Sequence, residues 1–210
     1  MLVLADAAWV RLNMTADGGS AGQSGPADEV DALLAAAASE FEAVGLSRAS
    51  LDVIARAAGV SRSTLYRRFV NKEALILAVL QRMLTTTMHD LDRATRNHSP
   101  QEAVVEAFAG AVRSLNSSRL YRRVFFEEQA LVRGLVTSVR EWTVGEVAGR
   151  VRDSLRRSGA QMPDDELLVV SELLVRIARS YVEIPSKLVA VDDESAMRDF
   201  AKRHLADLVY

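Results

Sequence analysis

The sequence predicts an all-α protein of about nine helices. Apolar residues recur at the three- and four-residue spacing of amphipathic helices, and the alternation typical of strands is nearly absent. Only four prolines occur in the 210 residues. Apolar residues make up 49% of the chain, which is enough for a hydrophobic core.

Composition removes several classes of protein. The chain has no cysteine, so disulfides and thiolate metal sites are excluded. Its three histidines, His89, His98 and His204, have no metal-ligand spacing, and no GxSxG, P-loop or HExxH motif is present. No apolar run approaches the roughly 18–20 residues that cross a bilayer. We therefore expect a cytoplasmic protein that is not an enzyme and has no catalytic residues, metal or cofactor.

Residues 1–27 read as an N-terminal extension that is disordered or loosely docked. Their second half is rich in Gly, Ser and Ala, which is typical of flexible linkers. Two interpretations stay open: an arm that touches DNA, although Arg11 is its only basic residue, or an upstream start codon, with Met14 as the alternative start.

The first predicted helix covers residues 28–44. Its apolar residues keep the helical spacing, and Gly45 ends it. It carries five acidic residues and no basic one, so we do not expect it to lie along DNA. Its expected role is to brace the next helices, with Phe41 as a core anchor.

Residues 50–72 predict a helix-turn-helix. Ser50 is a suitable N-cap, and apolar residues at 51, 54, 55 and 58 share one face. Gly59 supplies a tight turn, and Ser61 can cap a second helix over 62–69. Asn71 can cap a third helix that extends to about residue 96.

The second helix of this motif has the face that DNA reading requires. Leu65 and Phe69 lie one turn apart and face inward, so Ser63 and Arg67 point away from the core. Hydroxyl and guanidinium groups suit phosphates and base edges. The candidate DNA-binding residues from this face, its flanks and the following helix start are Arg62, Ser63, Thr64, Tyr66, Arg67, Arg68 and Lys72.

Charge supports the same interpretation. Residues 48–72 carry six basic side chains and one acidic one, on a chain whose net charge is −2. A basic patch on an acidic protein is typical of a nucleic-acid site. The alternative is an ordinary helical hairpin with a solvated arginine-rich face.

The pattern IARAAGVSRSTLYRRFVNKEAL closely resembles the N-terminal domain of the TetR family of bacterial transcriptional regulators. The resemblance covers about residues 28–80. It implies that Ser50 binds a phosphate, that Arg62, Ser63, Thr64 and Arg67 approach bases or nearby phosphates, and that Tyr66 and Lys72 hold the DNA backbone. The family often has an aromatic residue or histidine at the positions of Arg67 and Arg68, so a guanine contact from Arg67 is a hypothesis.

The remaining chain predicts a second helical domain. We expect a DNA-binding domain at 28–75 and an effector-binding and dimerisation domain at 76–210. Ser99, Pro100 and Glu102 form a strong helix start with a capping box. The further helices are expected at about 99–116, 119–133, 136–158, 164–184 and 194–208.

Three partners are expected: double-stranded DNA, a second copy of the chain and a small-molecule effector. A single reading helix contacts few base pairs, so we expect a homodimer through 164–184 and 194–208, although these apolar stripes could instead close the monomer's core. The resemblance suggests an apolar cavity and a hydrophobic or amphipathic effector. Candidate pocket residues are Met83, Phe108, Tyr121, Phe125, Phe126 and Trp142.

The sequence therefore predicts a transcriptional regulator, typically a repressor that an effector releases from a palindromic operator. The alternative is a helical protein–protein adaptor whose helix-turn-helix no longer binds DNA. In that case, replacing Arg67 with alanine would leave function intact.

Overall fold

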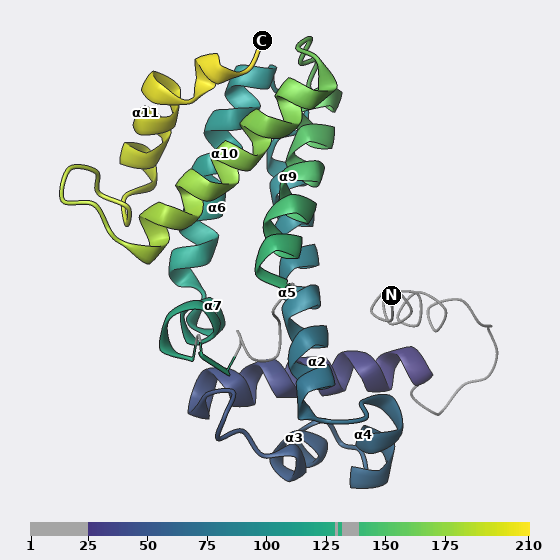
Figure 1. Cartoon of the computed structure of the whole chain (residues 1–210). Helices are drawn as coiled ribbons and strands as arrows, with labels where there is room; N and C mark the ends of the chain where they lie inside the picture. Colours follow the sequence, from purple (N-terminus) through teal and green to yellow (C-terminus); the bar gives the residue numbers. More distant parts are fainter. Residues whose placement is uncertain (1–24, 129, 132–138) are drawn as a thin grey trace. The chain divides into compact units, whose positions relative to one another are not determined.

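The computed structural model describes residues 25–128, 130–131 and 139–210. Within these ranges the chain is all-α, as predicted: it forms nine α-helices, one π-helical and one 3-10 segment, and no strand (Figure 1). The α-helices are α2 (Pro26–Val44), α3 (Leu51–Ala57), α4 (Arg62–Arg68), α5 (Lys72–Ala94), α6 (Pro100–Ser117), α7 (Arg119–Arg122), α9 (Val139–Arg157), α10 (Asp164–Glu183) and α11 (Glu194–His204). The predicted extension lies almost wholly outside the described residues.

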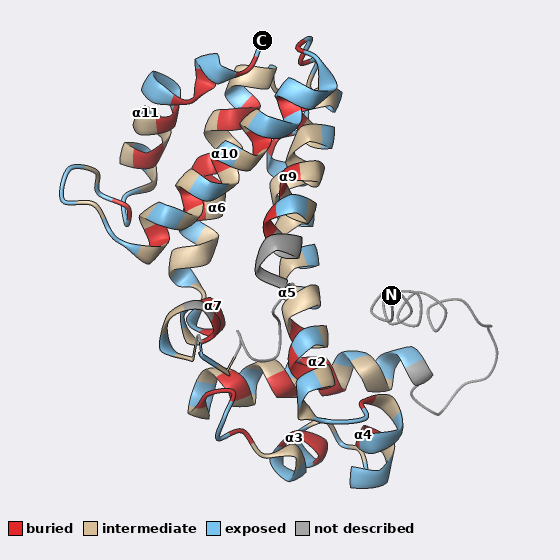
Figure 2. Cartoon of the chain, in the orientation of Figure 1, coloured by how far each residue is buried: buried red, intermediate tan, exposed pale blue. Residues whose placement is uncertain are grey.

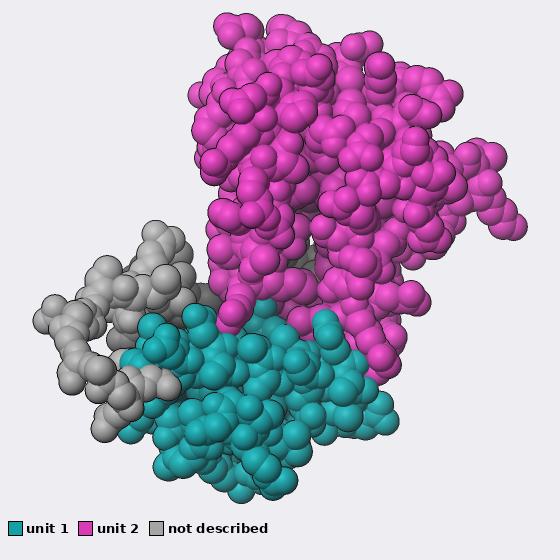
Figure 3. All heavy atoms as spheres, turned by 180° about the vertical axis from the view of Figure 1, so that it is seen from behind, with its two compact units in different colours: residues 1–44, 48–79 teal, residues 45–47, 80–210 magenta. Residues whose placement is uncertain are grey.

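The chain divides into two compact units (Figure 3). Unit 1 comprises residues 1–44 and 48–79, and unit 2 comprises residues 45–47 and 80–210. The boundary falls inside α5, four residues beyond the predicted one at 75. The short segment 45–47, which joins α2 to α3 in the sequence, belongs to unit 2.

Unit 1 is built around the inner faces of α2, α3, α4 and the start of α5. Figure 2 shows buried residues on α2, α3 and α4. Phe41 on α2 is fully buried, as are Ile54 on α3 and Leu65 on α4. Leu75 on α5 is also fully buried. The predicted role of Phe41 as a core anchor is confirmed. The inward faces of the short helices α3 and α4 are buried within unit 1.

In unit 2, α10 packs against α9 and α6, and α11 packs against α6. The predicted capping box is present at the start of α6: the Ser99 Oγ accepts from the Glu102 backbone N–H at 3.4 Å, and the Ser99 N–H donates to the Glu102 carboxylate at 2.9 Å. On α11 the apolar residues Met197 and Ala201 are buried. This helix ends at His204 and is followed by the 3-10 segment η2 (Ala206–Leu208), so the expected single helix to 208 is wrong at its end.

The predicted helix over 119–133 is confirmed only in part: the described chain is helical from Arg119 to Glu127, and residues 129, 132 and 133 lie outside the described residues. The chain forms only one turn of α7 and then the π-helical segment η1 (Arg123–Glu127), after which Glu128 leaves helical geometry. The Glu128 carboxylate accepts hydrogen bonds from the Leu46 N–H at 2.6 Å and the Ser47 N–H at 2.8 Å, and from the Ser47 hydroxyl. These contacts between positions about 80 residues apart have no local sequence signal.

The same hydrogen bonds set the protonation of Glu128. Partial burial acts to raise the pKa of its carboxyl group, but the hydrogen bonds from Ser47 and Leu46, with the nearby Arg123 cation, outweigh it and lower the pKa. The group is therefore a carboxylate at neutral pH.

None of the helices in the described ranges has the length and apolar character that a membrane span requires.

Candidate DNA-binding site

The turn between α3 and α4 is fixed by hydrogen bonds and by glycine. The Gly59 N–H donates to the Arg56 carbonyl at 3.1 Å, and the Val60 N–H donates to the Ala55 carbonyl at 3.0 Å. This pattern is the Schellman motif, which needs a residue in the left-handed region at its end. Gly59 has a φ of +69°. The turn predicted at this glycine is therefore present, and it directs the chain into α4 after only a few residues.

The start of α4 is held by hydroxyl groups. The Ser61 Oγ accepts from the Thr64 N–H at 3.1 Å, which confirms Ser61 as an N-cap. It also lies 2.8 Å from the hydroxyl of Ser63 and 2.8 Å from that of Thr64. Thr64 is half-buried and Ser63 is exposed, and the hydroxyls of both contact the capping Ser61.

The outward face of α4 is polar and exposed. Leu65 and Phe69 are buried, as predicted. The side chains of Arg62 and Arg67 are 62% and 68% exposed, and the Tyr66 residue is 42% exposed. Together with Ser63 these residues form the reading face, a name used below for Arg62, Ser63, Tyr66 and Arg67.

An acidic residue of α3 contacts this face. Asp52 Oδ1 lies 3.1 Å from Arg62 Nη1, and the guanidinium lies 5.7 Å from the centre of the Tyr66 ring. The hydrogen bond to Tyr66, and secondly the Asp52 charge, raise the pKa of Arg62 above its ordinary value. Arg62 is thus a permanent cation that the two neighbours orient. Asp52 and Arg62 lie ten positions apart on different helices, and no local pattern of the sequence predicted this pair.

Arg68 lies apart from the reading face. Its side chain is only 19% exposed, and its Nη2 lies 3.0 Å from Glu29 Oε2 on α2. Arg67 reaches the same oxygen at 4.0 Å. A DNA contact by Arg68 stays a prediction, and in this structure the charge of Arg68 is already paired with Glu29 inside unit 1. The partner of Arg68 is Glu29, in the first turn of α2. From the sequence, this residue served only to predict that α2 does not lie along DNA.

Two further candidates lie at helix starts. Ser50 is at the N-cap of α3, but its side chain makes no capping bond; its backbone N–H donates to Glu40 Oε1 at 3.2 Å. Asn71 caps α5 through its side-chain oxygen, which accepts from the Ala74 N–H at 2.8 Å. Lys72 is the first residue of α5, and the N–H groups at a helix start suit an anion such as a phosphate.

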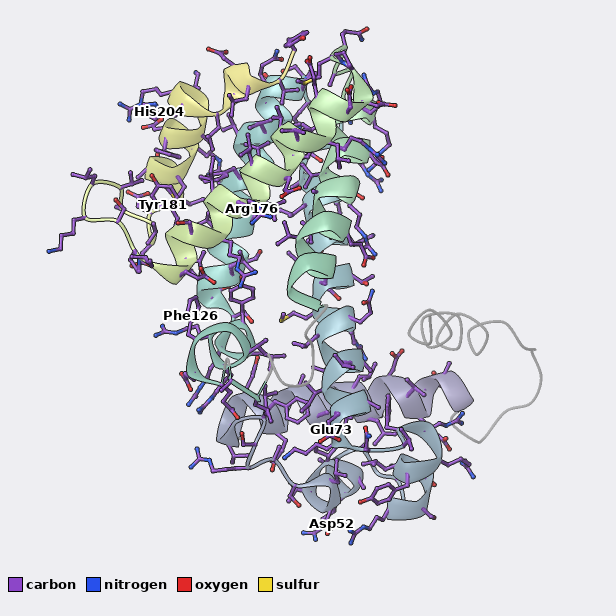
Figure 4. All side chains as sticks on the ribbon, in the orientation of Figure 1. Asp52, Glu73, Phe126, Arg176, Tyr181 and His204 are labelled. Carbon is purple, nitrogen blue, oxygen red and sulfur yellow. The ribbon has the colours of Figure 1, made fainter. Side chains whose placement is uncertain are left out.

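Four of the six predicted pocket residues lie in the apolar core of unit 2 or pack against it. Phe108 and Tyr121 are buried in the apolar core of unit 2, and Met83 and Phe126 pack against it. The Tyr121 and Phe126 rings meet edge to face, with centroids 6.2 Å apart (Figure 4 labels Phe126). The side chains of Phe125 and Trp142 are outside the described set. The pocket stays a prediction.

A small cavity occurs elsewhere in unit 2. Its volume is about 30 Å³, which is room for a water molecule rather than an effector. None of the predicted pocket residues lines it; the lining comes from α5, α6 and α9 and includes Thr95, Arg150 and Ser154. In the described parts of the chain there is no cluster of three or more His, Cys, Asp or Glu residues that could hold a metal ion.

A short helix held by a glycine turn, with cations and hydroxyls outward and its apolar side buried, defines a helix-turn-helix DNA-binding protein. Comparison of the chain with known proteins supports the same class of protein. Residues 33–79 match the family model described as bacterial regulatory proteins, tetR family. An uncharacterized HTH-type transcriptional regulator of Mycobacterium bovis is 31% identical over 147 residues, which cover 65% of this chain and 76% of that one. The chain belongs to the tetR family of bacterial regulatory proteins.

Two other relatives are informative. The HTH-type transcriptional activator FasR of Mycolicibacterium smegmatis is 38% identical over 115 residues, and this match spans about half of each chain, 52% in both. The crystal structure of the TetR family repressor AlkX from a Dietzia species superposes with a TM-score of 0.65 at 20% identity, covering 90% of this chain and 97% of that one. At that identity the likeness shows the fold.

Proposed function

We propose that the protein is a cytoplasmic, homodimeric transcriptional regulator that represses its target genes and is released from a palindromic operator by a small apolar or amphipathic effector. The observation that carries the proposal is the reading face: Arg62, Ser63, Tyr66 and Arg67 are exposed on one helix whose opposite side, Leu65 and Phe69, is buried. Ser50 and Lys72 at the starts of α3 and α5 supply the expected phosphate contacts.

The proposed dimer interface lies on α10. Its buried side, which includes Leu167 and Leu174, packs within unit 2, yet Leu168, Val169 and Leu173 are 36%, 61% and 46% exposed. Exposed apolar side chains on one helix favour an interface with a second copy. A two-fold dimer also doubles the number of base pairs that one reading helix can contact.

The expected participation of 194–208 in the dimer is not favoured. Met197 and Ala201 are buried, and α11 packs on α6 of its own chain. The outward positions of α11 include Lys202 and Arg203, which are charged and exposed. The alternative considered for this stripe, closing the monomer's core, fits the structure better.

The proposed effector and the proposed direction of regulation are argued from the named relatives. The AlkX structure is described as that of a repressor implicated in biodegradation of n-alkanes, which favours a lipophilic effector. FasR is named an activator, so relatives differ in sign. A ligand releases DNA only if it binds the two conformations with different affinity, and n-alkanes and their terminally oxidised derivatives of graded length are the first probes to titrate onto a protein–DNA complex.

The deciding experiment is fluorescence anisotropy with DNA tiles from upstream of the protein's own gene, at two salt concentrations. We expect one tile to bind tightly, with affinity that falls as salt rises because phosphate contacts release counterions. Arg67→Ala should lose selectivity for that tile, whereas the control Lys202→Ala, an exposed cation on α11, should bind as the wild type does. If the wild type binds no DNA at low salt, the proposal fails and the adaptor interpretation replaces it.

A further inference from the structure

Beside the reading face, and in contact with its Arg62, lies the carboxylate of Asp52, which DNA phosphates would repel. Asp52 lies in the first turn of α3, at the edge of unit 1 formed by α3 and α4 (Figure 4). Its side chain is 52% exposed, and it contacts Arg62 across the helix-turn-helix through Oδ1 at 3.1 Å and Oδ2 at 3.3 Å. Both partners therefore remain accessible to a third group.

This pair matters because Arg62 would otherwise bind phosphate at any DNA site. Non-specific binding consists of cation–phosphate contacts, which are indifferent to sequence. A guanidinium already paired with a carboxylate gains less from a phosphate, and the carboxylate repels that phosphate. A base edge, in contrast, can accept from the remaining N–H groups of a guanidinium that is held in a fixed orientation.

On the basis of the proposed function, we propose that Asp52 is a specificity-determining residue: by holding Arg62, it lowers the affinity for random DNA more than the affinity for the operator. Asp52 acts through Arg62, so it is a positioning residue. Tyr66, whose ring centre lies 5.7 Å from the same guanidinium, also limits the orientations of Arg62.

The test is Asp52→Asn, which keeps the size of the side chain and removes its charge. Binding to operator and to random duplex is measured by anisotropy over a series of salt concentrations. For random DNA we expect several-fold higher affinity at low salt and a log–log salt slope steeper by about one, the value for one additional phosphate contact. Operator affinity should change less, so the ratio of the two affinities falls.

Two further variants isolate the pair. Glu42→Gln on α2 removes an equal charge away from α4 and should leave the ratio unchanged. In an Arg62→Ala background, Asp52→Asn should no longer alter the ratio, because the cation that it would release is absent. Unfolding temperatures of all variants, measured alongside, show whether the fold is preserved.

The outcomes separate this inference from the proposed function. Selective DNA binding by the wild type with an unchanged ratio in Asp52→Asn overturns the inference alone, as does an equal rise in both affinities. The same change in the Arg62→Ala background would show that Asp52 acts as a distant charge and would also overturn it. A wild type that binds no DNA would overturn the proposed function, and the inference with it.

Discussion

Glu29 in the first turn of α2 pairs with Arg68 at the end of α4: Glu29 Oε2 lies 3.0 Å from Arg68 Nη2. Both side chains are mostly shielded from water, at 27% and 19% exposure. The Arg68 Nε is buried without a hydrogen-bond partner. The carboxylate of Glu29 therefore supplies an important part of the interactions that offset the loss of water around this guanidinium. This ion pair links the N-terminal turn of α2 to the C-terminal end of α4.

We expect Glu29→Gln to lower the stability of unit 1 by about 1–2 kcal/mol, because it leaves a shielded guanidinium without its counter-charge; the cost is below that for a fully buried pair, since water still reaches both groups. Thermal unfolding followed by circular dichroism measures the effect. Glu42→Gln on the same helix is the control, and equal melting temperatures for the two variants would show that the pair contributes nothing.

The two glycines with positive φ that flank α3 should differ in their tolerance of a side chain. At Gly59 a Cβ meets nothing within 4 Å, so Gly59→Ala should cost only backbone strain, about 1–2 kcal/mol. At Gly45, φ is +91° and a Cβ would lie 2.5 Å from Glu128 Oε1. Gly45→Ala should therefore lower the melting temperature further, because Glu128 must also move from its hydrogen bonds.

A second substitution checks that explanation. In a Glu128→Ala background the collision is absent, and Gly45→Ala should then cost no more than Gly59→Ala does. An unchanged large loss in that background would assign the whole effect of Gly45→Ala to its backbone.

The start of α6 should be sensitive to acid. Hydrogen bonds from the backbone N–H and the hydroxyl of Ser99 lower the pKa of Glu102 below its ordinary value of 4.5. A carboxyl whose pKa is lower in the folded state stabilises the fold above 4.5 and loses this contribution as pH falls through the folded value. Glu102→Gln should thus be less stable than the wild type at pH 7, and the difference should vanish in stronger acid. A difference that persists below the folded pKa would contradict this.

The dimer surface on α10 can be tested with one charge. Leu173→Glu places a carboxylate in the proposed apolar interface, so we expect dissociation to monomers and at least tenfold weaker operator binding, since one half-site contributes little alone. Sedimentation velocity reports the oligomeric state. Lys202→Glu, on the outward side of α11, should remain dimeric; a dimeric Leu173→Glu would place the interface elsewhere.

Local sequence patterns predicted most of the helix-turn-helix correctly. Gly59, Ser61 and Asn71 act through hydrogen bonds within a few residues, so the turn and caps could be read from the sequence, and the period of Leu65 and Phe69 fixed the outward side of α4. The partners of its arginines could not be read in that way. Glu29 lies 39 positions from Arg68, and a charge pattern does not state which opposite charges meet in space.

Unit 2 was less accessible for the same reason. The capping box of α6 is local and was predicted, whereas the ending of α7 at Arg122 accompanies a π-helical turn and the capture of Glu128 by Leu46 and Ser47. The apolar stripe of α11 predicted burial but not its partner, which proved to be α6. Stripes identify a buried face and leave open what covers it.

The hydrogen bonds that Leu46 and Ser47 donate to Glu128 bear on the design of chimaeric regulators. Unit 2 takes chain from two separate places, so a single junction at Val79 and Leu80 does not exchange whole units. A chimaera joined there would pair Glu128 with a foreign loop and lose the serine hydroxyl and fitting glycine that receive it. Carrying residues 45–47 along with unit 2, or replacing Glu128 with a neutral residue, would keep each transplanted unit self-consistent.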